Sequence, residues 1–303
     1  MVGIAYCRSM PAKIHFTSVA KINSIYWITS LHDEEVGVTR RVLDDLEPVC
    51  ASQQLPFKHF APTTALDFIK VLDAIAGEAQ QGMLPIIHFD THGSAQDGIF
   101  IAQSGEFVGW TVVAEKLREI NAATGNNLCV VSGACFSFNV IRQVDIHKAA
   151  PFFILLAPEH EILAGDIEAN TIGFYRDMLE EEDILVARGR WFPTQMRMFH
   201  CEEMLAAVLA KYINNAGLGK QREKRKEQLV TDALEQGVAR NRKNLRMLRK
   251  RADNLITPSE ELIERFLPIF LGGKRPAFTV KQLKQMVIDA RAEGLKPEGP
   301  YAT

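Results

Sequence analysis

The chain has 303 residues, of which 47% are hydrophobic and 24% charged, and its formal net charge is −2. This composition is ordinary for a soluble globular protein with a buried core, and it excludes a disordered chain and a protein that binds polyanions over its whole surface. The apolar runs are far shorter than the roughly 20 residues of a membrane helix, and the 5 cysteines form no Cys-x-x-Cys pair, which indicates reduced thiols in a cytoplasmic protein.

Short apolar strands alternate with amphipathic helices along the first part of the chain. We first predict a strand at 25–28, a helix from Val38, a strand at 57–60, and a helix opened by a capping box at Thr64 and Asp67. A strand at 83–89, a hairpin over 98–110 and a helix capped by Thr111 follow. Two further strands are predicted at 128–131 and 152–157, and each is followed by a helix. Apolar strands separated by amphipathic helices predict an α/β domain, with a mostly parallel sheet of five or six strands covered on both faces.

The residue pattern changes beyond Pro193, where residues of high helix propensity replace the strand-like apolar runs. Helices are predicted over 202–213 and 228–255, from Thr257, and over 280–292. We therefore divide the chain into an N-terminal segment (1–23), an α/β domain (24–192) and a helical extension (193–303). No cleaved secretory signal is expected, because residues 1–20 contain no continuous apolar stretch.

Reactive residues follow two of the predicted strands. The strand at 83–89 runs into Asp90-Thr91-His92-Gly93-Ser94, and the strand at 128–131 runs into Ser132-Gly133-Ala134-Cys135. In a doubly wound sheet, ligands bind at the carboxyl ends of the strands. If these two strands are neighbours, His92 and Cys135 face one another across a cleft.

This pair has a chemical rationale in acyl transfer. Cysteine attacks as a thiolate, which a neighbouring imidazole favours, and the imidazole later supplies a proton to the leaving amine. The tetrahedral intermediate needs donors for its oxyanion, and we expect the N–H groups of Gly93 and Cys135 to supply them. This chemistry requires no metal or organic cofactor.

The order of these residues resembles the caspase-like (clan CD) cysteine peptidases, whose mark is a strand ending in His-Gly, a spacer, and a strand ending in Ala-Cys. Within that clan the chain is most similar to the CHAT group of separase-related bacterial peptidases, on the strength of residues 151–158, the acidic residues after them, and Phe174-Tyr175. The resemblance covers residues 24–179. It implies a caspase-like sheet, a Cys135 nucleophile, a His92 general base and acid, and an oxyanion hole at Gly93. It also implies a dedicated protein substrate, in a bacterial antiviral defence system.

The residues of the loop after the strand at 152–157 indicate which side chain the specificity pocket binds. It carries four acids and no Lys or Arg before Arg176: Glu159, Glu161, Asp166 and Glu168. A pocket for a basic P1 residue needs a carboxylate, and CHAT and separase relatives place their pocket acid in this loop. We expect a basic P1 residue bound by Asp166, or failing that by Glu161, with Gly133 beside them where caspases carry Gln. The alternative is that these acids cap the helix beginning near Ile167.

Two other functions use the same residues differently. His88, Asp90 and His92 alternate along a strand and project from one face, as ligands of a metal-dependent hydrolase would. No complementary ligand cluster is evident elsewhere in the sequence. The second alternative is a caspase-like interaction module in which the cysteine and histidine are idle.

A basic segment lies in the helical extension. Residues 220–251 contain 12 basic and 4 acidic residues, with no aromatic residue among them. We interpret the segment as a solvated helix face; docking of an acidic partner or of nucleic acid, or cleavage of the segment by the enzyme itself, are the alternatives. The extension as a whole is expected to bind a regulatory partner.

Overall fold

The computed structural model describes residues 14, 16 and 20–294, so most of the predicted N-terminal segment 1–23 lies outside the described residues. The chain divides into two compact units. Of the described residues, 20–201 and 268–274 form an α/β unit, and 14, 16, 202–267 and 275–294 form a helical unit. No helix in the described part of the chain is both long enough and apolar enough to cross a membrane.

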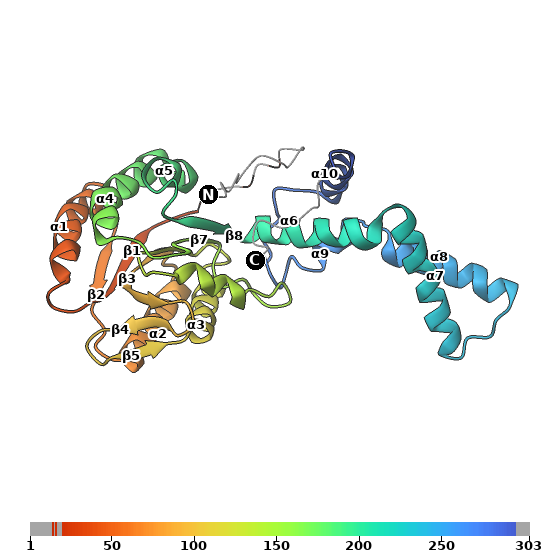
Figure 1. Cartoon of the computed structure of the whole chain (residues 1–303), viewed down its shortest axis with the longest axis horizontal. Helices are drawn as coiled ribbons and strands as arrows, with labels where there is room; N and C mark the ends of the chain where they lie inside the picture. Colours follow the sequence, from red (N-terminus) through yellow and green to blue (C-terminus); the bar gives the residue numbers. More distant parts are fainter. Residues whose placement is uncertain (1–13, 15, 17–19, 295–303) are drawn as a thin grey trace. The chain divides into compact units, whose positions relative to one another are not determined.

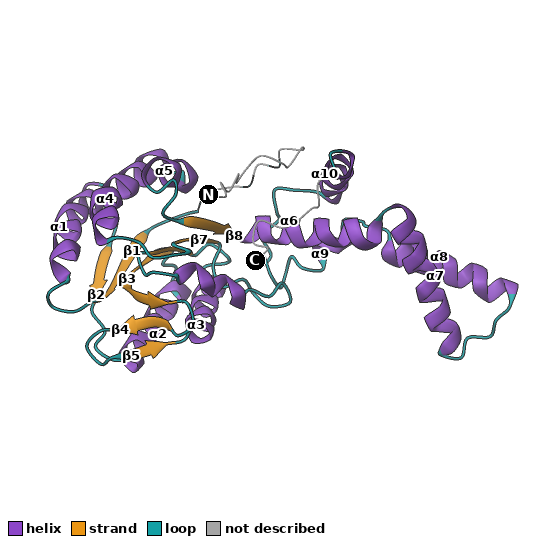
Figure 2. Ribbon diagram, viewed as in Figure 1, coloured by secondary structure: helices purple, strands orange, loops and turns teal. Residues whose placement is uncertain are grey.

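A mixed sheet is the centre of the α/β unit (Figure 2). Its strands are β1 (Ser24–Ser30), β2 (Phe57–Phe60), β3 (Pro85–Ser94), β6 (Cys129–Ser132), β7 (Ile154–Ala157) and β8 (Arg197–His200). They lie in the order β2-β1-β3-β6-β7-β8, and only β8 runs antiparallel to its neighbour. A hairpin of β4 (Gly98–Ile101) and β5 (Glu106–Val108) pairs with the end of β3. The predicted mostly parallel α/β sheet is confirmed, with eight strands where five or six were expected.

Helices cover both faces of this sheet (Figure 1). On one face lie α1 (Val36–Ser52), α4 (Ala164–Glu181) and α5 (Ile184–Trp191). On the other lie α2 (Ala65–Gln80) and α3 (Trp110–Ala123). Strand β1, which lies between β2 and β3, is therefore buried on both faces, which explains its unbroken apolar run from Ile25 to Ile28.

Two predicted helix starts have different outcomes. Thr64 caps α2 as expected, since its Oγ1 accepts a hydrogen bond from the Asp67 N–H at 3.1 Å. The cap predicted at Thr111 is wrong, because α3 begins one residue earlier, at Trp110, with Gly109 as its N-cap. The buried Trp110 side chain donates to the Ser94 carbonyl at 3.0 Å, which fixes the start of the helix.

Strand β8 is a correction to the predicted helical extension. The sequence pattern places residues 197–200 in that extension, yet they pair antiparallel with β7 at the edge of the sheet. Phe199 is fully buried and packs edge-on against Phe152, with 5.1 Å between the ring centroids. Four residues with one buried aromatic side chain are too short a pattern to distinguish a strand from a helix.

In the helical unit, the helices predicted over 202–213 and 280–292 are observed, and the other two predicted helices have different bounds. It consists of α6 (Cys201–Tyr212), a π-helical turn η2 (Ile213–Gly217), α7 (Gly219–Glu235), α8 (Arg242–Ile256), α9 (Glu261–Glu264) and α10 (Val280–Ala292). The predicted helical run 228–255 is interrupted after α7, where Gly237 adopts a φ of +97°. Glycine tolerates this left-handed backbone and so ends the helix. α7 and α8 then pack against each other as a helical hairpin.

The basic segment 220–251 coincides with this hairpin. Three of its cations are in ion pairs, Arg222 with Asp253, Lys226 with Glu223, and Arg249 with Glu227. Most of the segment is helical, and Arg240 lies in the exposed loop between the two helices. The partner, nucleic-acid and self-cleavage alternatives for this segment stay predictions, and Arg240 is the position where cleavage is sterically easiest.

Candidate active site

The carboxyl ends of β3 and β6 meet at one edge of the sheet. The two strands are parallel neighbours, with Phe89 opposite Ser132. The Gly133 N–H continues the pairing by donating to the Phe89 carbonyl at 2.8 Å. The two reactive loops predicted from the sequence therefore leave the sheet side by side.

Gly93 is packed directly against Cys135. A Cβ atom on Gly93 would lie 2.3 Å from the Cys135 carbonyl oxygen and 3.2 Å from the Ala134 Cβ. The first distance is too short for any side chain, so only glycine allows this approach to the Cys135 backbone. The close contact brings the chain at His92 and Gly93 against the chain that carries the thiol.

Cys135 lies in a tight turn against the loop that follows β7. Its side chain is half-buried, and its Sγ accepts a hydrogen bond from the Ile162 N–H at 3.4 Å. The next residue, Phe136, has a φ of +60°, and its N–H donates to the His160 carbonyl at 3.1 Å. The backbone of residues 160–162 thus borders the thiol on the side opposite β3.

His92 is held by a carboxylate from the β1–α1 connection. Its Nε2 lies 2.8 Å from Glu35 Oε2, and the same oxygen accepts a hydrogen bond from the His32 N–H at 3.1 Å. The hydrogen bond from His92 is the largest cause that lowers the pKa of Glu35 below its ordinary value. Glu35 is also the N-cap residue of α1, where the positive end of the helix favours an anion. The bond to Glu35 uses the Nε2 nitrogen of the imidazole and not its Nδ1 nitrogen.

Glu35 was missed in the sequence. Its signal is the acidic run Asp33-Glu34-Glu35, which lies between the first apolar strand and the helix after it. The run lies at the same carboxyl edge as the other reactive residues, since β1 is the neighbour of β3. A rule that collects carboxylates at strand ends would have found it.

The predicted specificity residues lie beside this turn. The Gly133 backbone contacts the Ile167 side chain, which would be 3.1 Å from a Cβ at that position. Asp166 is half-exposed in the first turn of α4, and Glu161 is exposed in the loop next to Ile162. The other two acids of the loop are engaged elsewhere: Glu159 is ion-paired with Arg197, and Glu168 with Arg41.

The helix after this loop starts earlier than expected. It begins at Ala164 with Leu163 as its N-cap, where the sequence predicted a start near Ile167 capped by Asp166. The alternative interpretation of Asp166 as a cap is therefore wrong, because its side chain makes no cap hydrogen bond at this helix start. Asp166 still contributes a favourable negative charge to the first turn.

The residues of the metal alternative are bound to separate partners. His88 stacks on Trp27 with 3.5 Å between ring centroids and its Nδ1 lies 2.8 Å from the Tyr175 hydroxyl, while burial lowers its pKa to about 3. Asp90 accepts hydrogen bonds from Thr39 at 2.5 Å and from Trp27 at 3.4 Å. In the described ranges, no group of three or more His, Cys, Asp or Glu side chains is arranged to hold a metal ion. This geometry does not favour the metal-dependent hydrolase.

Comparison with known proteins gives a distant structural likeness. No protein-family model and no curated protein matches the chain. Among solved structures, it is similar to a secreted C11 cysteine protease, iotapain, from Bacteroides thetaiotaomicron, with 11% sequence identity, a TM-score of 0.41, and coverage of 65% of this chain and 71% of that chain. Membership of the CHAT group stays a prediction.

Proposed function

We propose that the protein is a cysteine endopeptidase in which Cys135 is the nucleophile and His92 the general base and acid. The observation that carries this proposal is the packing of Gly93 against the Cys135 carbonyl, where no side chain fits. Such a contact fixes the two reactive loops relative to one another. Glu35 adds a carboxylate on the far nitrogen of the imidazole, an arrangement suited to orienting a base.

The reaction follows from these positions. His92 takes the thiol proton as Cys135 Sγ attacks the peptide carbonyl carbon, and the negative oxygen is met by the N–H groups of Gly93 and Cys135. The carbon–nitrogen bond then breaks, and the imidazolium donates its proton to the leaving amine. A water molecule, deprotonated by His92, hydrolyses the thioester and releases the acid product. Glu35 orients the imidazole and stabilises its positive charge in both halves.

Glu35 is expected to act as a positioning residue. Replacing it with alanine should lower kcat by about tenfold or more, because the imidazole loses its fixed orientation and its counter-charge, while KM changes little. Glu34→Ala is the matched control, since Glu34 is its exposed neighbour in the chain. Steady-state kinetics on one fluorogenic peptide measure all three proteins. Equal losses in both variants, or a loss confined to KM, would contradict this role.

The hydrogen bond between His92 and Glu35 should depend on pH in a defined direction. His92 holds the pKa of Glu35 below its ordinary value, so the ionised carboxylate that accepts the His92 hydrogen bond is present above that lowered pKa and is lost as the pH falls through it. In His92→Phe the Glu35 pKa should rise toward its ordinary value. A carbon-13 NMR titration of the Glu35 carboxyl in both proteins measures the change. An unchanged Glu35 pKa in the variant would show that the hydrogen bond is absent in solution.

We place the P1 side chain beside Gly133 and Asp166, and propose that it is basic. Asp166→Asn keeps the size of the side chain and removes its charge, so kcat/KM for an Arg-P1 peptide should fall about 10- to 100-fold, the value of a charge-assisted hydrogen bond. Glu161→Gln is the control that separates the two candidate acids. A fluorogenic panel that varies only P1 measures both. If wild type prefers Asp or an apolar residue at P1, the assignment fails while the peptidase proposal stands.

A further inference from the structure

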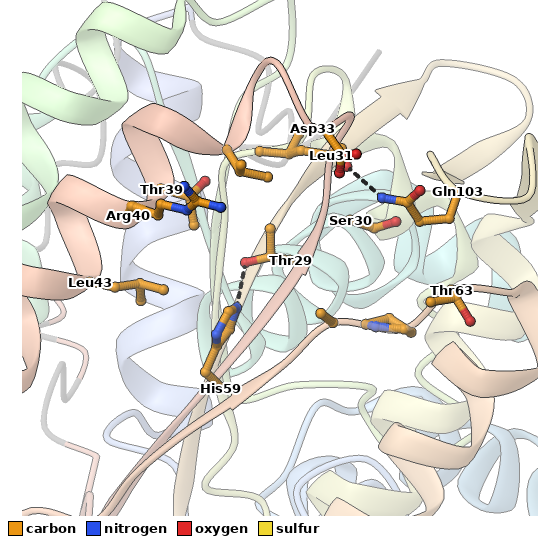
Figure 3. Close-up of a pocket in the computed structure, with 13 residues that line it drawn as sticks. Thr29, Ser30, Leu31, Asp33, Thr39, Arg40, Leu43, His59, Thr63 and Gln103 are labelled. Atoms are coloured by element: carbon orange, nitrogen blue, oxygen red, sulfur yellow. Dashed lines mark hydrogen bonds between the residues drawn. The ribbon is translucent and has the colours of Figure 1, made fainter.

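A cavity of about 290 Å³ opens at the same edge of the sheet, between the ends of β1 and β2 and the start of α1. In Figure 3, Thr39, Arg40 and Leu43 of α1 lie on one side of it, and Gln103 and Thr63 on the other. The cavity is close to the candidate active site. Asp33 and Val36, which flank Glu35 in the chain, are part of its lining.

The strand order places this cavity on the His92 side of the candidate active site, away from Cys135. Cys135 follows β6 and His92 belongs to β3, and the next two strands outward are β1 and then β2. His92 therefore stands between the nucleophile and the cavity. The predicted specificity residues Gly133 and Asp166 lie on the other side, toward β7 and α4.

The chemistry of acyl transfer then decides which part of a substrate would reach the cavity. The general acid must come within hydrogen-bond reach of the leaving nitrogen. A peptide crossing this edge consequently has its acyl half toward Cys135 and its leaving half beyond His92. Neighbouring strands are about 4.8 Å apart, which puts the cavity about 10 Å beyond the scissile bond, or two to three extended residues.

The lining of the cavity favours an uncharged, aliphatic side chain. Three hydroxyl groups of the lining already take part in hydrogen bonds within the protein. Thr39 and Thr29 bond to the buried Asp90 carboxylate, at 2.5 and 3.4 Å, and Ser30 Oγ accepts from the Ala102 N–H at 3.1 Å. The remaining buried or half-buried lining is apolar, from Leu31, Val36, Leu43 and Pro62.

The charged lining residues do not change this selection. Asp33 and Arg40 carry opposite charges and are both exposed, so solvent screens them at the rim. The volume is enough for one large side chain and too small for a typical organic cofactor.

We propose that this cavity is a primed-side subsite that binds an aliphatic side chain of the substrate, Leu, Ile or Met, at the second or third residue after the scissile bond. The proposal rests on the peptidase function. It assigns substrate selectivity to the cavity lining supplied by residues 29–43 and 59–63.

The test compares three substrates with the same acyl half. One ends at P1 with a fluorogenic amine, and the other two continue for four residues, one with Leu and one with Ser at the second and third primed positions. Ala61→Trp fills the cavity from its exposed rim, and Ala51→Trp is the matched control on an exposed position of α1 that does not line it. Each variant and wild type are assayed for kcat/KM on every substrate.

We expect wild type and Ala51→Trp to cleave the Leu substrate about tenfold better than the Ser substrate, as one side chain in an apolar pocket allows. Ala61→Trp should lose this preference and still cleave the truncated substrate at the wild-type rate. Cleavage of both extended substrates without a Leu preference, or a preference that survives Ala61→Trp, overturns the subsite alone. No Cys135-dependent cleavage of any of the three substrates by wild type overturns the peptidase function and the subsite with it.

Discussion

Replacing Cys135 with alanine is expected to reduce peptide cleavage by at least about 10⁴-fold, because no other group can form the thioester on which both halves of the reaction depend. The variant should fold normally. Cys135 is half-buried, and its Sγ makes only weak hydrogen bonds to the Ile162 backbone, at 3.4 and 3.8 Å. Thermal unfolding of the two proteins, measured with cleavage of an Arg-P1 peptide, separates loss of activity from loss of structure.

Cys50 and Cys129 supply the matched controls. Both are fully buried, and burial raises the pKa of the Cys50 thiol to about 11 and that of Cys129 to about 12, so both remain protonated and unreactive at neutral pH. Cys50→Ala and Cys129→Ala should keep kcat while lowering stability. Cleavage by Cys135→Ala at the wild-type rate would assign the activity to another residue. Absence of cleavage in every protein would favour the interaction module with idle residues.

The second large effect is expected from a single methyl group. Gly93→Ala places a Cβ at 2.3 Å from the Cys135 carbonyl oxygen, so the end of β3 and the cysteine turn must separate by about 1 Å. A displacement of that size between a nucleophile and its base costs about 100-fold in rate. The overpacking itself should lower the free energy of unfolding by about 1 to 3 kcal/mol.

Gly77→Ala is the matched control for this substitution. Gly77 lies inside α2, and a Cβ there would meet nothing within 4 Å. Alanine should therefore stabilise the protein by about 0.5 to 1 kcal/mol and leave kcat/KM unchanged. Chemical denaturation and steady-state kinetics on both variants make the comparison. Wild-type activity in Gly93→Ala would show that the contact does not hold the reactive loops in place.

The sequence was informative where one segment carries the signal by itself. Continuous apolar strands predicted the parallel sheet, and the Thr64 cap and the last helix at 280–292 were placed correctly. The residue types at two strand ends were enough to select His92, Gly93 and Cys135 for one edge of the sheet. That prediction needed only the rule that parallel strands present their carboxyl ends together.

What the sequence could not supply depends on contacts between distant segments. Glu35 is 57 positions from His92 in the chain, and only the pairing of β1 with β3 brings them together. Strand β8 depends on the packing of the buried Phe199 side chain against Phe152. The cavity between β1, β2 and α1 is a property of packing that no single segment encodes.

The most direct test of the central claim is covalent labelling with a peptidyl acyloxymethyl ketone that carries Arg at P1, followed by mass spectrometry of the modified peptide. This electrophile reacts only with a nucleophile that lies in the substrate site. We predict one label, on Cys135, and strongly slowed labelling in His92→Ala. A label on any other cysteine, or equal labelling rates with and without the imidazole, would contradict it.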